Sequence, residues 1–247
     1  KGEKEKTFEE ACAQADLFIN NIFKATAATH YVMAWTVGKK TCFRYTIDPQ
    51  YKANRKYTQV LPFLKELKEY LMNKYNAVFN ENLEADDIVR VLKKMPMQFT
   101  LDDHREWVDQ GSPTPLFFIV SPDKDILKLE GEHFNPREMR WVVTSKEDAE
   151  WNFWTSMVTG DTIDGIKGIP KKGIKFVQKL IKDKKEGETL AQIIFREYLK
   201  HFGEHEGIEE FYKNYKLLRI VGHFDKESKH VPLTEARRVE TSVVDSK

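Results

Sequence analysis

The sequence lacks the features that mark disulfide-rich, zinc-stapled, secreted or membrane-spanning proteins. Its 247 residues include two cysteines, Cys12 and Cys42, and no CxxC pair, which fits a reducing compartment and argues against a disulfide scaffold or a zinc ribbon. No apolar run reaches the ~18 residues that a membrane span needs. The first six residues are charged and lack the apolar stretch of a secretory signal. We therefore expect a cytoplasmic protein, in the host-cell cytoplasm if it is viral, with no membrane partner.

An excess of charge of one sign is also absent. The chain has 40 basic and 39 acidic residues and a formal net charge of +1. Seven acidic residues fall into three short motifs, and without them the rest of the chain has a net charge of about +8. A basic body around an acidic hole suits a polyanion that is bound together with metal ions. A mixed, solvated surface explains the same composition equally well.

The hydrophobic pattern changes character along the chain. Its first part alternates between helix-like and strand-like segments, and Leu116–Val120 is an apolar run typical of a strand covered on both faces. From about residue 147 the pattern is helical. We predict an α/β fold with a mostly parallel central sheet flanked by helices over residues 1–158. A helical region over 159–247 follows, and its last ~25 residues are expected to be a polar, loosely ordered tail.

The individual elements follow from periodicity and capping signals. Helices are predicted over residues 7–25, with Thr7 and Glu10 as a capping box, and over 60–75, 84–95, 147–158, 173–183, 187–202 and 207–221. Strands are predicted at 31–36, 77–79, 116–120 and 139–143. Residues 43–56 are expected to form a loop and Gly111–Pro115 a linker.

Three acidic motifs stand at helix starts or strand ends, where an α/β sheet places its sites. Their seven carboxylates are Glu84, Asp86, Asp87, Asp123, Asp125, Asp161 and Asp164. Each motif taken alone has a structural explanation, as helix-dipole partner, helix cap or Gly/Asp turn. Together the seven carboxylates can supply the oxygen ligands of two hard divalent ions that act on a phosphodiester. No covalent nucleophile with an attendant base is evident.

The segments LEADDI, VSPDKDILKL and GDTIDGIKGI resemble the three core motifs of the 5′-nuclease (flap endonuclease) superfamily. The upstream FR…DPQYKANRK resembles the basic segment before that family's helical arch, and order and spacing are most similar to podovirus-type phage exonucleases. The resemblance implies a PIN-like core and a metal-dependent 5′→3′ exonuclease or flap endonuclease using two Mg²⁺ (or Mn²⁺) ions. Its implied substrates are duplex DNA ends, 5′ flaps or RNA–DNA hybrids, and it would act as a monomer.

The resemblance also implies roles for individual residues. Glu84, Asp86 and Asp87 would serve the first metal, Asp123 and Asp125 would lie near both ions, and Asp161 and Asp164 would hold the second. Arg44, Lys52 and Arg55 would grip the scissile phosphate, Tyr51 would stack on a terminal base, and Lys56 would contact DNA. Residues 165–173 resemble a helix–hairpin–helix clamp that can also hold K⁺ through backbone carbonyls. Its DNA contacts would come from Lys167, Gly168, Lys171, Lys172, Gly173 and Lys175.

The sequence departs from the family pattern in four respects. The family's first strand, which carries a ligand Asp, has no counterpart in these 247 residues, and the next strand ends at Thr36 or Val37, which offer no carboxylate. Pro170 replaces a clamp glycine, and the short segment between Arg55 and Val60 predicts a reduced arch. The alternative interpretation is a nuclease-fold DNA-binding protein with an incomplete first metal site. A third interpretation is a PIN-like ribonuclease. The YKANR segment and the lysine clamp argue against it.

Overall fold

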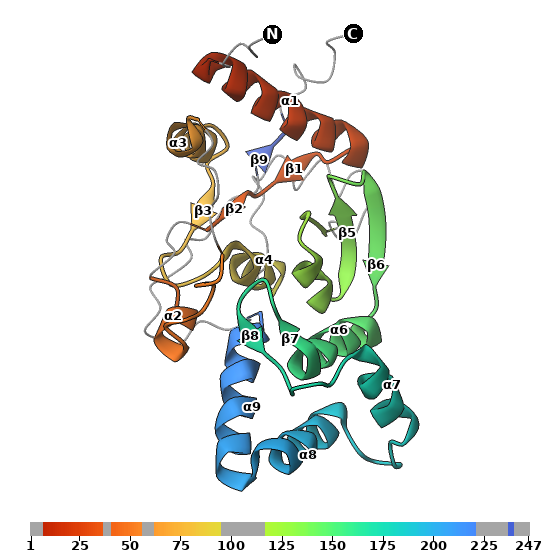
Figure 1. The fold of residues 1–247 in the computed structure, drawn as a ribbon. Coiled ribbons are helices and arrows are strands. Elements are labelled where there is room, and N and C mark those ends of the chain that lie inside the picture. Colours follow the sequence, from red (N-terminus) through yellow and green to blue (C-terminus); the bar gives the residue numbers. More distant parts are fainter. Residues whose placement is uncertain (1–6, 37–40, 56–61, 95–116, 221–236, 240–247) are drawn as a thin grey trace, which may run out of the picture.

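The structure is a computed structural model that describes residues 7–36, 41–55, 62–94, 117–220 and 237–239. Figure 1 shows a strand-containing middle, one long helix (α1) across one end and a group of helices (α7, α8 and α9) at the other. The predicted α/β class is therefore confirmed. Among the described residues, no helix is both long and apolar enough to cross a membrane. The predicted linker at Gly111–Pro115 lies outside the described residues.

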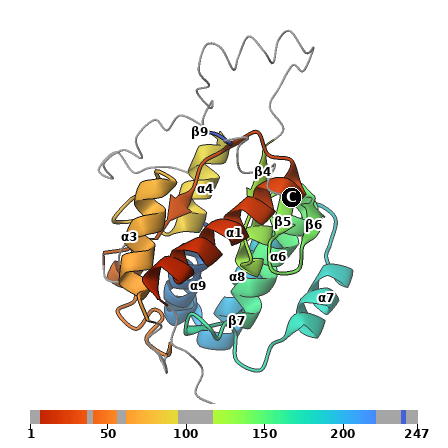
Figure 2. The ribbon, with the colours of Figure 1, turned by 90° about the horizontal axis from the view of Figure 1, so that it is seen from above.

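The first helix, α1 (Phe8–Thr26), forms as its sequence predicts because the signals that start it are local. Thr7 Oγ1 accepts a hydrogen bond from Glu10 N at 3.2 Å, and Thr7 N donates to Glu10 Oε2 at 2.9 Å, which completes the capping box. Asp16 fixes α1 to α3 (Leu64–Lys74) by accepting hydrogen bonds from Tyr70 and Lys74. Figure 2 shows α1 crossing the molecule between α3 and the strands β4, β5 and β6.

The described strands form four small sheets instead of one continuous sheet. They are β1 (His30–Tyr31), β2 (Ala34–Trp35), β3 (Val78–Phe79), β4 (Phe118–Val120), β5 (Gly131–Asn135), β6 (Arg140–Thr144), β7 (Gly160–Asp161), β8 (Ile166–Lys167) and β9 (Arg237–Arg238). Parallel pairing joins β2 to β3 and β4 to β5, whereas β5–β6, β7–β8 and β1–β9 are antiparallel. Two of these five pairings are parallel, so in the described residues the sheet structure is mixed and not mostly parallel as predicted.

Three strand expectations need correction. The strand predicted at 31–36 is broken into β1 and β2, and β5 was not foreseen. The strand β4 is not covered on both faces, because Val120 is 39% exposed and only Ile119 of the three residues is buried. Within the described residues β4 has a single neighbour, β5, so one of its edges gains no sheet partner. Part of the tail predicted to be loose pairs with β1 as β9.

The helices that follow the acidic motifs lie close to their predicted positions. They are α4 (Ala85–Lys94), α6 (Lys146–Thr159), α7 (Ile174–Lys182), α8 (Leu190–Phe202) and α9 (Glu204–Leu218). The 3₁₀ helix η1 (Lys124–Lys128) was not predicted, and the short α2 (Arg44–Ile47) corrects the loop expected over 43–56. One hydrophobic cluster joins Met157 and Val158 of α6 to Val177, Ile194 and Tyr198. The domain boundary predicted at residue 158 therefore falls inside a packed core.

Candidate metal and nucleic-acid site

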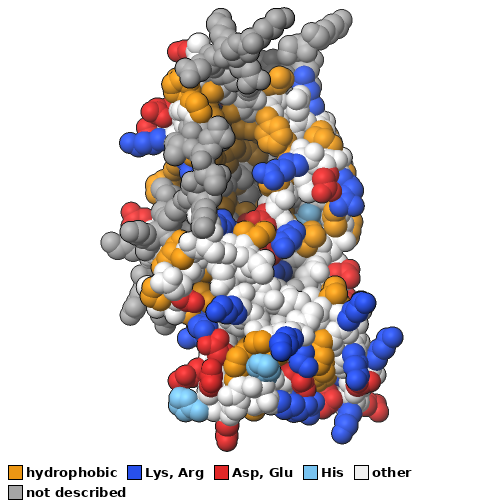
Figure 3. Space-filling model, viewed as in Figure 1, with side chains coloured by type: hydrophobic (Ala, Val, Ile, Leu, Met, Phe, Trp, Pro, Cys, Tyr) orange, Lys and Arg blue, Asp and Glu red, His pale blue; other side chains and the backbone are white. Residues whose placement is uncertain are grey.

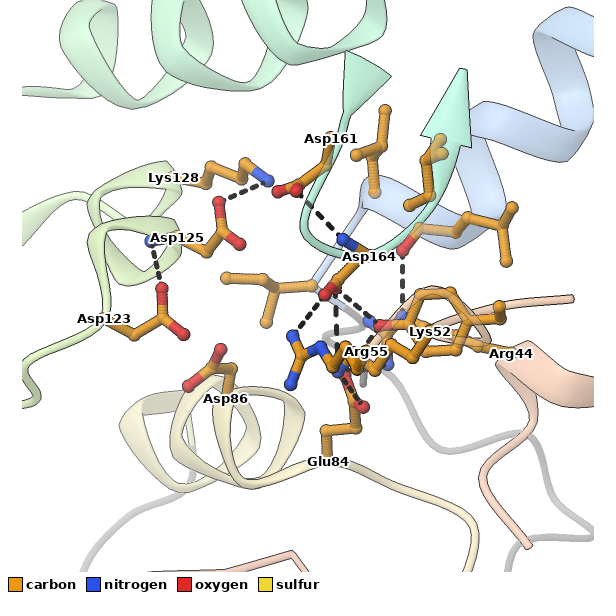
Figure 4. Close-up of a pocket in the computed structure, with 15 residues that line it drawn as sticks. Arg44, Lys52, Arg55, Glu84, Asp86, Asp123, Asp125, Lys128, Asp161 and Asp164 are labelled. Atoms are coloured by element: carbon orange, nitrogen blue, oxygen red, sulfur yellow. Dashed lines mark hydrogen bonds and ion pairs between the residues drawn. The ribbon is translucent and has the colours of Figure 1, made fainter. Parts of the chain in front are cut away.

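A cavity lies where the three acidic motifs meet, between α4, η1 and the β7–β8 hairpin (Figure 4). Six of the seven predicted carboxylates line it, and Asp87 does not. The lining residues are Arg44, Tyr51, Lys52, Arg55, Glu84, Asp86, Asp123, Asp125, Lys128, Asp161, Asp164, Ile166, Leu217, Leu218 and Ile220. Segments as distant in sequence as Arg44 and Ile220 therefore converge on one recess with a mainly polar lining.

The first acidic motif divides between the cavity and the core. Glu84 precedes α4 and Asp86 lies in its first turn, where the helix dipole favours negative charge. Burial, followed by the charges of Asp123 and Asp87, raises the pKa of Asp86 to about 7. A carboxyl that is costly to ionise in a crowd of carboxylates is one that a cation stabilises strongly.

Asp87 is a structural partner and not a cavity ligand, which corrects its predicted role. It is fully buried and accepts two hydrogen bonds from Arg44, at 2.6 Å from Nη1 and 2.9 Å from Nη2. Burial alone would lower the pKa of Arg44, but the hydrogen bonds and charge of Asp87 raise it above its usual range. The pair joins α2 to α4 inside the protein.

Arg44 was predicted to grip the scissile phosphate, and its contacts leave no donor for that task. Besides Asp87, its guanidinium donates to the carbonyls of Leu217 (2.9 Å) and Arg219 (3.0 Å) and contacts Cys42 Sγ at 3.9 Å. These contacts, with the two to Asp87, occupy all five N–H groups of an arginine. Arg44 therefore ties α2 to the end of α9.

Tyr51 was predicted to stack on a terminal base, but it is 3% exposed and belongs to the core. Its hydroxyl lies 3.1 Å from Glu84 Oε2 and 3.0 Å from Asp164 Oδ2, so its single proton can serve either carboxylate. Burial and the charge of Glu84 raise the pKa of Tyr51 above its usual range, which keeps it a donor. Tyr45 packs against its ring at a centroid distance of 5.4 Å and Lys52 Nζ lies 4.8 Å from the ring centre, so the buried ring is not open to a base.

Lys52 and Arg55 reach into the cavity from the turn after α2. Lys52 Nζ pairs with Glu84 and lies 3.6 Å from Asp164, and Arg55 Nη2 pairs with Asp164. Both cations thus already contact oxygens of candidate metal ligands. A phosphate oxygen bound at the same place would lie within their reach. Lys56 lies outside the described residues.

In the second and third motifs, a carboxylate that lines the cavity also accepts backbone hydrogen bonds that fix the local structure. Asp123 Oδ1 caps η1 by accepting from Asp125 N at 2.9 Å, as the capping explanation of the sequence requires. Asp161 Oδ1 accepts from Ile163 N (2.8 Å) and Asp164 N (3.1 Å), which fixes the turn between β7 and β8. In Figure 4 these carboxylates still point into the shared recess. The structural and the metal-binding explanations are therefore compatible.

The donor set fits a hard divalent ion. Asp125, Asp161 and Asp164 each offer an oxygen, and these atoms all lie within 4.8 Å of one another. Such oxygen ligands suit Mg²⁺ or Mn²⁺, which keep water molecules in the remaining positions. Glu84, Asp86 and Asp123 line the same cavity and supply further oxygens.

Thr36, at the end of β2, occupies the position where the family pattern leads us to look for another carboxylate. Its hydroxyl accepts a hydrogen bond from Ala85 N at 2.9 Å and so caps the start of α4. The neighbouring Val37 lies outside the described residues. Thr36 therefore supports the helix that carries Asp86 but adds no anionic ligand.

The segment predicted to form the clamp, residues 165–173, contains β8 and the turn that leads into α7. Lys167, Lys171 and Lys175 are exposed, and Lys172 Nζ lies 4.1 Å from the centre of the Phe176 ring. Figure 3 shows basic side chains, in blue, gathered around α7 on this face. A basic surface of this kind suits a nucleic-acid backbone.

The two predicted clamp glycines differ in their surroundings. A Cβ on Gly168 would lie 2.2 Å from Val158 O and 2.4 Å from Gly160 N, so this glycine serves the close packing of the hairpin on α6. A Cβ on Gly173 would meet nothing within 4 Å, so the start of α7 is open to solvent or a ligand. Only Gly173 offers the free backbone approach that the clamp interpretation requires.

Sequence reasoning missed Lys128, which lines the cavity with its ammonium 3.0 Å from Asp125 Oδ1. The available signal was its spacing. In a 3₁₀ helix residues three apart stand one above the other, and Lys128 follows Asp125 by three in η1. Apart from its metal-binding role, Asp123 was considered only as a helix cap, and no helix was predicted over residues 124–128, so this pairing was not seen.

No family model matches the chain. In sequence it is similar to an exodeoxyribonuclease of Enterobacteria phage T3, at 26% identity over 220 residues, 73% of this chain and 66% of that protein. It is also similar to a 5′-3′ exonuclease of Buchnera aphidicola, at 27% over 179 residues (66% and 56%), and to DNA polymerase I of Bacillus subtilis, at 27% over 190 residues (67% and 19%). The chain thus spans about two thirds of the phage T3 relative and less of the other two.

In structure the chain is similar to the bacteriophage T5 flap endonuclease in a complex with DNA and metal ions. The TM-score is 0.58 at 19% identity, covering 85% of this chain and 80% of that one. A T5 5′-exonuclease with bound zinc gives a TM-score of 0.52 at 20% identity, covering 87% and 79%. At these identities the likeness establishes a common fold.

Proposed function

We propose that this chain, which belongs to the 5′-nuclease superfamily, is a divalent-metal-dependent nuclease that hydrolyses phosphodiester bonds of DNA from a 5′ end. It acts as a 5′→3′ exonuclease or a flap endonuclease. The observation that carries the proposal is the cavity in which carboxylates from three separate segments converge, with three oxygens within 4.8 Å of one another. No capping or turn requirement explains that convergence.

Two metal ions fit the proposed chemistry. Asp125, Asp161 and Asp164 would hold one ion, and Glu84 and Asp86 would hold the other, with Asp123 near both. When bound, such ions activate a water molecule and stabilise the leaving oxygen of a phosphodiester. Mg²⁺ and Mn²⁺ are the proposed ions because the ligands are all carboxylate oxygens.

The chain's cations would bind and orient the DNA. Lys52 and Arg55 would transfer hydrogen bonds from Glu84 and Asp164 to the scissile phosphate and offset its developing charge. Arg44 and Tyr51 would act indirectly, by holding Asp87, Glu84 and Asp164 in place. This division assigns phosphate contact to the two basic residues with partly exposed side chains.

The region after residue 158 would bind the duplex on the far side of the cut. The exposed lysines around α7 would contact backbone phosphates, and the carbonyls of the 165–173 turn offer a K⁺ site. Suitable substrates are duplex ends, 5′ flaps and RNA–DNA hybrids, bound by a monomer. The continuity of this surface with the β7–β8 hairpin supports the assignment, because that hairpin carries Asp161 and Asp164.

One observation favours a second candidate function, a DNA-binding protein with little catalysis. The Thr36 hydroxyl caps α4, so Thr36 provides no further anionic ligand on the side of the cavity where Glu84 and Asp86 lie. An ion on that side would be held by fewer carboxylates than one at Asp125, Asp161 and Asp164. The two candidates differ in whether the carboxylates are needed for cutting.

The test is cleavage of 5′-labelled duplex, 5′-flap and RNA–DNA hybrid substrates with Mg²⁺ or Mn²⁺. The wild type is compared with an Asp123→Asn/Asp125→Asn double variant and with Glu132→Gln, an exposed acid on β5, as the matched control. We expect cleavage that the double variant loses by at least ~10²-fold and the control retains. If the wild type binds the substrates without carboxylate-dependent cleavage in either metal, the DNA-binding alternative replaces the proposal.

A further inference from the structure

A lysine stands against the candidate metal ligands in a place that the proposed chemistry does not need. Lys128 Nζ lies 3.0 Å from Asp125 Oδ1, and Asp125 is one of the three aspartates whose oxygens cluster within 4.8 Å. The Lys128 side chain is only 8% exposed, against 27% for Asp125. The ammonium is thus held inside the cavity wall, as Figure 4 shows, and is not a loose surface charge.

Its position follows from local geometry and from packing. Lys128 and Asp125 stand one above the other because η1 is a 3₁₀ helix with three residues per turn. Ile126 of the same helix is buried, and Asn152 of α6 donates to Leu127 O at 2.9 Å, which fixes η1 on α6. The buried stem on this fixed helix therefore holds the ammonium beside Asp125, at the cavity.

An incoming ion must therefore meet a positive charge that is already in place. A Mg²⁺ ion on the Asp125 oxygen that Lys128 contacts would lie no more than about 5 Å from the ammonium. That separation is shorter than the ~8 Å Debye length at physiological salt, so their repulsion is poorly screened. Either the ion binds against this repulsion or Lys128 has to release Asp125.

We propose that Lys128 is a positioning residue that competes with the divalent ion for Asp125 and thereby lowers the metal affinity of this site. It orders Asp125 and offsets the mutual repulsion of the aspartates in the metal-free protein. When an ion binds, the ammonium is displaced from Asp125 toward the cavity. This inference rests on the proposed function, because it takes Asp125, Asp161 and Asp164 as metal ligands.

The test is the affinity of the protein for Mn²⁺, measured by electron paramagnetic resonance of the free ion and by calorimetry, without DNA and without turnover. Lys128→Gln removes the charge, and Lys128→Met removes it while keeping an aliphatic side chain for the buried stem. Lys124→Gln is the matched control, because Lys124 is an exposed residue of the same 3₁₀ helix and loses the same charge. We expect both Lys128 variants to bind Mn²⁺ at least tenfold more tightly than the control.

The gain in melting temperature on adding Mn²⁺ supplies a second readout, which loss of a merely structural lysine would not increase. We expect the Lys128 variants to melt below the wild type without metal, yet to gain more in melting temperature from saturating Mn²⁺. Unchanged or weaker Mn²⁺ binding in both folded variants overturns the inference while leaving the metal site intact. Absence of Mn²⁺ binding in the wild type and every variant overturns the proposed function as well.

Discussion

Replacing Arg44 by Met should unfold the protein more readily, and the structure sets the size of the effect. The guanidinium is 3% exposed and satisfies Asp87, which is fully buried, together with the carbonyls of Leu217 and Arg219. Met keeps the aliphatic stem but leaves Asp87 as a buried charge without its partner. Arg44 thus offers a sharp separation between a residue that holds the site and one that performs its chemistry.

Breaking a buried ion pair by removing one partner costs about 3–5 kcal/mol, because the remaining charge stays desolvated. For a chain of this size that corresponds to a fall in melting temperature of roughly 6–20 °C. Arg55→Met is the matched control. Its side chain is 37% exposed and its ion pair with Asp164 is at the cavity, so we expect a change within ~1 kcal/mol.

Urea unfolding of Arg44→Met, Asp87→Leu and the double variant measures the coupling directly. The double variant has no buried charge left, so its free energy of unfolding should return to within ~1–2 kcal/mol of wild type, with a coupling of at least ~2 kcal/mol. If Arg44→Met instead unfolds within ~1 kcal/mol of wild type but abolishes cleavage, the structural role is refuted and direct phosphate contact is restored.

Two further predictions concern the metal and the hairpin. The pKa of Asp86 is raised from 3.8 to about 7, so the stability of the metal-free protein falls as pH rises from about 4 to 7. Below pH 7 a metal ion must also displace the proton of this carboxyl in order to bind. Mn²⁺ should therefore bind roughly tenfold more tightly at pH 8 than at pH 6, and an Asp86→Asn variant that keeps the full pH dependence would contradict this cause. Gly168→Ala places a Cβ 2.2 Å from Val158 O and should lower stability by about 1–3 kcal/mol, whereas Gly173→Ala, with open space around it, should be neutral; equal melting temperatures would refute the packing argument.

The parts of the fold that sequence predicts well are those specified by nearby residues. The capping box of Thr7 and Glu10 starts α1 as predicted, and the acidic motifs are found at the expected turns because Asp123 and Asp161 also serve as local caps. Strand extent is set by distant partners. The split between β1 and β2, and the pairing of β5 with both β4 and β6, depend on neighbours that no local pattern names.

The same limit applies within the site. The residue types in the run Glu84–Asp87 do not by themselves predict that Asp86 faces the cavity while Asp87 binds Arg44, 43 positions earlier in the chain. A signal was present in the helical period, because Asp87 stands four residues before Val91, which is buried. Reading that spacing would have placed Asp87 on the inner face of α4. The burial of Tyr51 gives no comparable local signal, since it depends on its packing with the C-terminal helices.

The β7–β8 hairpin has one more consequence. Gly160 in β7 and Gly168, just after β8, approach so closely that a Cβ on either would lie 2.4 Å from the backbone nitrogen of the other, so we expect the hairpin to move as one body. One end of that body carries Asp161 and Asp164, and the other leads into the lysines before α7. If DNA binds the lysine end as proposed, a shift imposed there would reach the aspartates, and the ion would then alter the affinity for DNA by the same factor as DNA alters the affinity for the ion. We therefore predict that binding of the two ligands is coupled through these two glycines.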